Sequence, residues 1–209
     1  MTLQVARSPQ LYNPNPHGCV LFLPLWHDEL SGGVFSSVDD FRHICTVTGA
    51  LWRPSGRFFD GNDDKITFPS LGIGANGTAS VIMWFRLDTT ATVKGAPISL
   101  LGDWLYQNNA NNYLYAPGGA YNWAGGPAAN IWYHLAVTWA GNSTTAILYH
   151  DTIAVAAIGT WAMSAFTTTI GNATNSMSGL VGEFRVYKDR VLTAAEVAHD
   201  RNATKWRYQ

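Results

Sequence analysis

The chain has little charge and no apolar run long enough to cross a membrane. Asp, Glu, Lys and Arg make up 13% of its 209 residues, about half the usual share of roughly a quarter, and the formal net charge is −1. So small a net charge creates no field that attracts a polyanion, so we expect no nucleic-acid partner. The longest apolar run, Cys19–Trp26, is far shorter than the ~20 residues of a bilayer span, so we expect no membrane association.

Cysteine is also scarce. Cys19 and Cys45 are too few for a disulfide framework or a thiolate zinc site, so we expect two buried thiols that pack as small apolar side chains. The segment Met1–Pro9 has no apolar stretch of the kind found in secretory signals, so we expect no signal peptide. These features leave the localisation unknown, and a virion surface stays open.

Local signatures of catalysis are missing. The chain has no Gly-x-Ser-x-Gly elbow, no His-Glu-x-x-His helix and no Gly-Lys-Ser/Thr phosphate loop. Five of its six histidines show no ligand spacing, and His134 lies in an apolar strand pattern, where a packed or hydrogen-bonded structural histidine is the favoured interpretation.

The apolar pattern is that of β-strands. Residues 131–139 alternate between two faces, and 80–87 and 180–187 are similar apolar stretches. The stretches 146–150 and 153–156 flank the two-residue turn Asp151–Thr152 and predict a hairpin. Closely spaced strands without helices between them indicate an all-β, antiparallel β-sandwich. Six strand residues are expected to be buried: Trp84, Trp132, Leu135, Val137, Phe184 and Val186.

One helix is expected near the C-terminus. Thr193-Ala194-Ala195-Glu196 is a capping-box pattern that predicts a short helix through about Asp200. We therefore divide the chain into an N-terminal arm (1–17), a β-domain (18–191) and a C-terminal helix and tail (192–209).

Four motifs, in order, resemble those of the laminin-G-like and concanavalin A-like lectin and glucanase jelly rolls. They are Gly56–Ile66, with its Phe-Asp-Gly core, Trp132–Trp139, Ala146–Asp151, and Gly179–Tyr187 followed by Leu192–Val197. The resemblance covers roughly Cys19 to Val197 and implies a jelly roll. Because the family is functionally broad, the resemblance says little about activity.

Two positions depart from the family pattern. Gly182 stands where many relatives carry an aspartate that often helps to hold a structural calcium ion, and Thr152 stands where glycine usually follows the hairpin aspartate. We predict no cofactor, and a structural calcium ion is left open. Four aspartates offer carboxylates for one, although turn and loop formation is the favoured interpretation: Asp39, Asp40, Asp63 and Asp64.

The carboxylates do not match the catalytic pattern of the family's β-glucan hydrolases. Those enzymes use a Glu-x-Asp-x-x-Glu strand, whereas this chain has only Glu29, Glu183 and Glu196, none followed two residues later by aspartate. We therefore expect no enzymatic activity, and a glycoside hydrolase or lyase is the least favoured alternative.

The middle of the chain is nearly free of charge and rich in aromatic residues. Between Trp104 and Gly182 the only charged residue is Asp151. Aromatic rings pack on the C–H faces of sugars and amides pair with their hydroxyls, so we predict a ligand-binding site in 103–123. The alternative is that these rings fill the core. The candidate residues are Trp104, Tyr106, Tyr113, Tyr115, Tyr121 and Trp123.

The sequence thus favours a non-catalytic, lectin-like binding domain that contacts a glycan or a protein partner. The alternative is a virion structural or decoration protein of a phage, since lectin-like jelly rolls occur on phage particles. In that case the proline-rich arm, Ser8–Pro16, and the aromatic tail, Lys205–Tyr208, would contact neighbouring subunits in a homo-oligomer or larger assembly. Closing the edges of the sandwich is the other role open to both segments.

Overall fold

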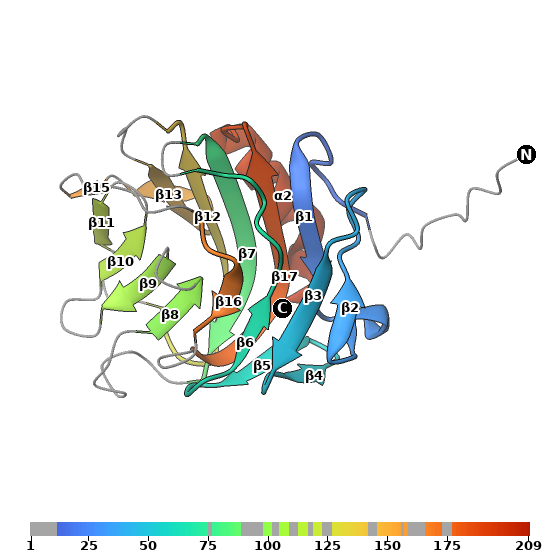
Figure 1. The fold of residues 1–209 in the computed structure, drawn as a ribbon. Coiled ribbons are helices and arrows are strands. Elements are labelled where there is room, and N and C mark those ends of the chain that lie inside the picture. Colours follow the sequence, from blue (N-terminus) through green and yellow to red (C-terminus); the bar gives the residue numbers. More distant parts are fainter. Residues whose placement is uncertain are drawn as a thin grey trace, which may run out of the picture.

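Two antiparallel β-sheets packed face to face form the body of the protein, and a C-terminal helix lies behind them in the view of Figure 1. The computed structural model describes residues 12–74, 77–88, 98–101, 105–108, 113–116, 119–122, 127–141, 146–155, 157–158, 166–172 and 177–209. The fold is the predicted all-β sandwich with a short C-terminal helix.

Sheet A is the middle layer and contains the long central strands. Within the described ranges it has eight strands. The first half of β17 pairs with β5, and the second half of β17 pairs with β1. In spatial order they are β14 (Ile153–Val155), β13 (Ile147–His150), β12 (Trp132–Trp139), β7 (Ala79–Leu87), β17 (Ser178–Lys188), β5 (Gly56–Asp60) and β4 (Leu51–Arg53), with β1 (Cys19–Pro24) beside β17.

Sheet B is the front layer in Figure 1. Its nine strands within the described ranges are β15 (Ala157–Ile158), β11 (Gly119–Asn122), β10 (Tyr113–Ala116), β9 (Leu105–Asn108), β8 (Ile98–Leu101), β16 (Thr169–Gly171), β6 (Lys65–Thr67), β3 (Ile44–Thr48) and β2 (Val34–Ser36). Only the contact between β8 and β16, at Leu101 and Gly171, is parallel among the described pairings.

The core lies between the sheets and follows the two-residue period of the strands. The ring of Phe184 in sheet A lies 6.1 Å from that of Phe68, which follows β6 of sheet B. Each fully buried apolar side chain of this size contributes about 1.5–3 kcal/mol. The sheet A residues on this inner face are Val81, Met83, Phe85, Leu135, Val137, Trp139, Phe184 and Val186, all buried. Both cysteines are buried and free, as predicted, and burial raises the pKa of each thiol to about 12.

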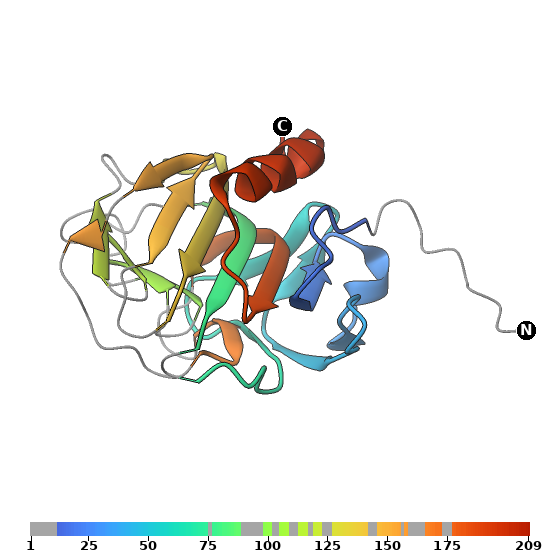
Figure 2. The same ribbon diagram turned by 90° about the horizontal axis from the view of Figure 1, so that it is seen from above.

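The outer face of sheet A is covered by helix α2 (Ala194–Thr204) and the short 3-10 helix η3 (Lys205–Arg207), as Figure 2 shows from above. The predicted capping box is present: the Thr193 hydroxyl accepts from the Glu196 N–H, and the Glu196 carboxylate accepts from the Thr193 N–H. The helix continues past Asp200 to Thr204, because Asp200 and Thr204 are both buried against the sheet. A second 3-10 helix, η2 (Asp28–Leu30), follows β1. Of the helices in the described ranges, none combines the length and apolarity that a membrane span requires.

Five of the six residues predicted to be buried are buried, and Trp132 is the exception. Trp132 begins β12 on the outer face, where the Arg86 guanidinium lies 5.8 Å from its ring and the Tyr208 ring 4.8 Å away, so it is only partly covered. Trp84 is buried on this same outer face, beneath the helix, rather than between the sheets.

The predicted hairpin is present, and its turn is conformationally costly. β13 and β14 pair His150 with Ile153, and the intervening Asp151 and Thr152 both have positive φ, 48° and 77°, as in a type I′ turn. The turn therefore has a backbone geometry that suits glycine at its second residue, although that residue is Thr152. A left-handed residue with a side chain costs roughly 1–2 kcal/mol.

We expect Thr152→Gly to raise the free energy of unfolding by about 0.5–1 kcal/mol, because relief of that strain exceeds the added entropy of the unfolded chain. Urea denaturation measures this change. The matched control is Thr46→Gly in β3, an exposed strand position, which should lose stability. Equal losses in both variants would contradict the strained turn.

Candidate functional site

Four of the six predicted ligand-binding residues lie on three adjacent strands of sheet B. Tyr106 is in β9, Tyr113 and Tyr115 are in β10, and Tyr121 is in β11. These strands form one end of sheet B, on the left in Figure 1. The other two predicted residues, Trp104 and Trp123, lie outside the described residues.

The backbone register groups these tyrosines further. Tyr115 is paired directly with Tyr106, and Tyr113 occupies the next position of the same parity in β10. Tyr121 is paired with Leu114, so it occupies the alternate set of positions. Residues paired directly in an antiparallel ladder belong to the same face of a sheet. Three of the four tyrosines therefore share one face by register.

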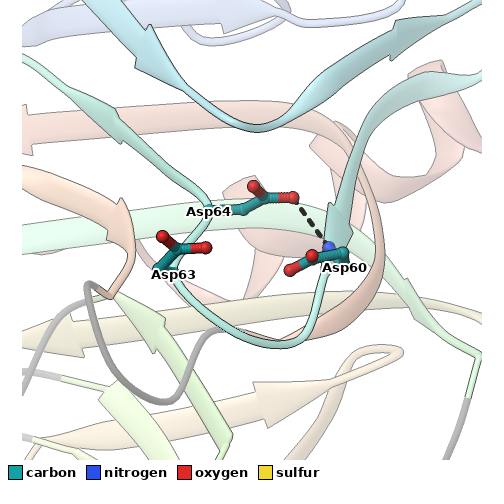
Figure 3. A group of neighbouring side chains, drawn as sticks. All are labelled: Asp60, Asp63 and Asp64. Atoms are coloured by element: carbon teal, nitrogen blue, oxygen red, sulfur yellow. Dashed lines mark hydrogen bonds between the residues drawn. The ribbon is translucent and has the colours of Figure 1, made fainter.

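Three aspartates gather at the end of β5 and in the turn that leads to β6 (Figure 3). One carboxylate oxygen from each of Asp60, Asp63 and Asp64 lies within 4.8 Å of the others. Asp64 is buried and accepts from the Asp60 N–H at 2.8 Å, and Asp60 accepts from the Asn62 N–H at 2.8 Å. Burial raises the pKa of Asp64. The hydrogen bond from the Asp60 N–H lowers this pKa, and the charges of Asp60 and Asp63 raise it, so that the net shift is upward.

These contacts support the turn-forming interpretation. Two of the three carboxylates already satisfy backbone N–H groups of the turn, whereas a calcium ion needs six to eight oxygen ligands. Asp39 has the same role elsewhere, since it accepts from the N–H groups of Phe22 and Phe41, and Asp40 is exposed.

The departure at Gly182 has a structural reason. The Tyr208 ring covers this glycine so closely that a Cβ at 182 would lie 2.3 Å from the Tyr208 Cε1 atom. Tyr208 is buried and stacks on Trp84 at 4.6 Å. No aspartate fits at this position, so the residues present do not fit a calcium site that uses it. Tyr208, the last residue of the aromatic tail Lys205–Tyr208, instead closes the outer face of sheet A.

A buried cluster of charged residues lies between sheet A and α2. Arg185 of β17 donates to both oxygens of Asp200 in α2, at 3.1 and 3.2 Å, and to Glu183 at 2.6 Å. His134 of β12 contacts Asp200 through Nε2 at 3.2 Å. These four side chains are 0% exposed. His134 is thus a structural histidine, as predicted, inside a network that clamps the helix to the sheet.

Opposite charges stabilise one another within this cluster. Burial alone would raise the pKa of Asp200, but the charge of Arg185 and the hydrogen bond from His134 outweigh burial and hold it below its usual value. Burial would likewise lower the pKa of Arg185, but Asp200 and Glu183 raise it. The sequence analysis considered His134 and Glu183 but did not predict this network. His134 and Asp200, which are in contact, are 66 residues apart in the chain, so no local pattern links them.

Among the hollows on the described surface, two differ in size and lining. The larger, about 720 Å³, lies beside the start of β1 and has a charged rim that includes Asp40, Lys188 and Asp189. The smaller, about 400 Å³, is bounded by the turn between β4 and β5 and by η3. Its lining is Trp26, Pro54, Ser55, Trp206, Arg207 and Tyr208. The sequence analysis did not predict a ligand site at this second hollow. The aromatic tail, which lines part of the hollow, was the feature of the sequence that pointed to it.

The fold and these sites define a concanavalin A-like β-sandwich. A laminin G family model, described as concanavalin A-like lectin/glucanases superfamily, matches residues 60–198. The chain belongs to this superfamily. No curated protein matches the chain.

Solved structures with the same fold include proteins that act on or bind carbohydrates. Trypanosoma rangeli sialidase matches with a TM-score of 0.65 and 17% identity over 90% of this chain, which spans only 33% of the sialidase chain. Domain 4 of AbnA, a GH43 extracellular arabinanase from Geobacillus stearothermophilus, in complex with arabinotriose, matches with a TM-score of 0.59 and 16% identity. That alignment covers 87% of this chain and 97% of the domain. Such identities show the shared fold alone.

Proposed function

We propose that the protein is a non-catalytic, lectin-like binding domain that contacts a glycan through an aromatic, uncharged surface. The observation that carries this proposal is the placement of four tyrosines on the adjacent strands β9, β10 and β11, in a stretch of chain whose only charge between Trp104 and Gly182 is Asp151. Rigid aromatic side chains provide a large contact area for a small loss of entropy. A neutral, hydroxyl-rich ligand suits such a surface.

The positions of the glutamates support a role without catalysis. Glu183 is fully buried and accepts from Trp26, Arg185 and Arg207. Glu196 caps α2. Glu29 lies exposed in η2. Glycoside hydrolysis uses two Asp or Glu carboxylic groups about 5–10 Å apart on either side of the bond to be cleaved, and two of the three glutamates already serve the fold.

The neighbouring structures support a carbohydrate as the ligand in this proposal. The arabinanase domain, 97% of which is covered by the match, is described in complex with arabinotriose, and the sialidase is described in complex with sialic acid. A neutral oligosaccharide fits an uncharged surface better than an anionic oligosaccharide does. The proposal therefore favours a neutral glycan.

The test is a glycan array with the purified protein, together with an assay for released reducing sugar. We expect binding to at least one neutral oligosaccharide and no release of sugar from it. Hydrolysis that Glu183→Gln abolishes while the protein stays folded would overturn the non-catalytic assignment, and binding confined to anionic glycans would overturn the ligand class.

One observation favours the second candidate function, a structural subunit of a virion or similar assembly. Three edge strands each expose an aliphatic side chain: Val34 of β2 is 62% exposed, Leu51 of β4 60% and Ile153 of β14 59%. Edge strands usually carry charge or proline that blocks pairing with another chain. Native mass spectrometry separates the two functions, because an assembly subunit forms a defined oligomer without any glycan.

A further inference from the structure

The aromatic tail leaves one tryptophan on the surface beside a hollow. Trp206 of η3 is 62% exposed, although Tyr208, two residues later, is buried. The hollow of about 400 Å³ that Trp206 lines with Trp26 and the Pro54–Ser55 turn is within the size range of small-ligand pockets, about 300–1,000 Å³. The chain end marked C lies away from the yellow-green strands β9–β11 in both Figure 1 and Figure 2.

Trp206 is exposed, and neighbouring groups hold it in place. Its indole N–H donates to the Ala203 carbonyl at 3.1 Å. The Arg207 guanidinium lies 4.5 Å from the centre of the Trp206 ring and also 4.5 Å from that of Trp26, between the two indoles. Cation–π contacts of this kind orient both rings.

A single buried carboxylate anchors this arrangement. Glu183 is 0% exposed; it accepts from the Trp26 indole N–H at 3.0 Å and forms an ion pair with Arg207. The same Glu183 pairs with Arg185, which Asp200 also binds, so the anchor belongs to the network that clamps α2. Binding surfaces gain affinity when their side chains are ordered before the ligand arrives.

The hollow presents no excess charge. Arg207 is its only charged lining residue, and Glu183 neutralises it from below. Two arginines, Arg185 and Arg207, balance two carboxylates, Glu183 and Asp200. An anionic ligand therefore finds no unbalanced cation, whereas an indole face and the Ser55 hydroxyl match the C–H face and hydroxyls of a neutral sugar.

We propose that the hollow between Trp206, Trp26 and the Pro54–Ser55 turn binds one ring of a neutral oligosaccharide. This inference rests on the proposed function for its ligand class, and it adds a second contact made by residues that the tyrosine strands do not include. Trp206 is the stacking residue, and Arg207 and Glu183 are positioning residues.

Isothermal titration with arabinotriose and cellotriose tests the proposal. We expect Trp206→Ala to weaken binding of at least one trisaccharide about tenfold or more, as for a central aromatic contact. Because Trp206 is exposed, the variant should keep the wild-type melting temperature. Tyr12→Ala is the matched control: Tyr12 is 59% exposed, lies outside the hollow, and should bind as the wild type does.

A second variant tests the positioning role. Arg207→Lys keeps the positive charge beside Glu183 but removes the planar group that contacts both rings, so we expect affinity to fall several-fold, by less than in Trp206→Ala. Retention of full affinity by Arg207→Lys would contradict the positioning role of the guanidinium.

The remaining outcomes separate the two proposals. Unchanged affinity in Trp206→Ala with loss of affinity in Tyr113→Ala would overturn this site and leave the proposed function standing. Binding of no neutral glycan by the wild type would overturn both. An oligomer that Trp206→Ala dissociates, with sugar affinity unchanged, would assign the hollow to a protein contact and overturn the sugar site.

Discussion

We expect Asp200→Asn to lower the free energy of unfolding by about 3–5 kcal/mol, the cost of breaking a buried ion pair while its partner stays buried. Asn keeps the shape of the side chain but removes its negative charge. Arg185, 0% exposed, would then share Glu183 with Arg207, so that two arginines would face a single carboxylate. Since Asp200 lies in α2 and Arg185 in β17, the helix should loosen from sheet A.

The matched control is Asp151→Asn. Asp151 forms its ion pair with Arg201 at 3.1 Å, but the two side chains are 26% and 30% exposed. Partly exposed pairs contribute at most about 1 kcal/mol, so this variant should lose far less stability. Chemical denaturation of both variants measures the difference. Equal and small losses would mean that the cluster contributes no more than a surface pair.

The same cluster sets an acid limit on stability. Because the folded protein holds the pKa of Asp200 below its usual value, the stabilisation is complete above about pH 4 and is lost as the pH falls through the folded-state value. The wild type should therefore lose stability below about pH 4, and Asp200→Asn should show a shallower decline.

Gly182→Asp should cost about 3–5 kcal/mol as well, through overpacking and an unpaired buried carboxylate. A Cβ at this position would lie 2.3 Å from the Tyr208 ring, which is held by Trp84 at 4.6 Å and Trp132 at 4.8 Å and has little room to move. The expected result is displacement of Tyr208 and exposure of the Trp84 site. In the folded variant, tryptophan side chains should be more exposed to solvent than in the wild type, and the midpoint of unfolding should be lower.

Two comparisons make this prediction specific. Gly33→Asp is the control, because a Cβ at Gly33 meets nothing within 4 Å, and its stability should change little. Tyr208→Ala should cost several kcal/mol alone, and the double variant Gly182→Asp/Tyr208→Ala should lose much less than the sum, since both changes remove the same contact. Additive losses would show that Tyr208 is not what restricts position 182.

Local patterns in the sequence predicted most of the fold. The alternation in 131–139, the Asp151–Thr152 turn and the capping box at Thr193 each depend on neighbours within a few residues, and each is present. The burial of Trp132 was predicted wrongly, because its exposure depends on where α2 and Tyr208 cover the outer face. Contacts between distant segments, such as His134 with Asp200, leave no local pattern.

The candidate site could be proposed from the sequence in part, for the same reason. Composition and spacing indicated the aromatic middle segment, and backbone register adds that Tyr106 and Tyr115 are direct partners. The Trp26–Arg207–Trp206 arrangement joins the end of β1 to the C-terminal tail through Glu183, and only the folded chain brings these parts together. The absence of aspartate at Gly182 was visible, whereas its cause, the Tyr208 ring, was not.

The most direct test of the central claim is the affinity of the purified protein for a neutral glycan at low and high salt. If the contact is aromatic and uncharged, the affinity should change less than about twofold between about 50 mM and about 500 mM salt, because there is almost no charge to screen. Tyr113→Ala combined with Trp123→Ala should weaken binding while the protein stays folded. Steep salt dependence, or full affinity in the folded double variant, would contradict the account and place the glycan contact elsewhere.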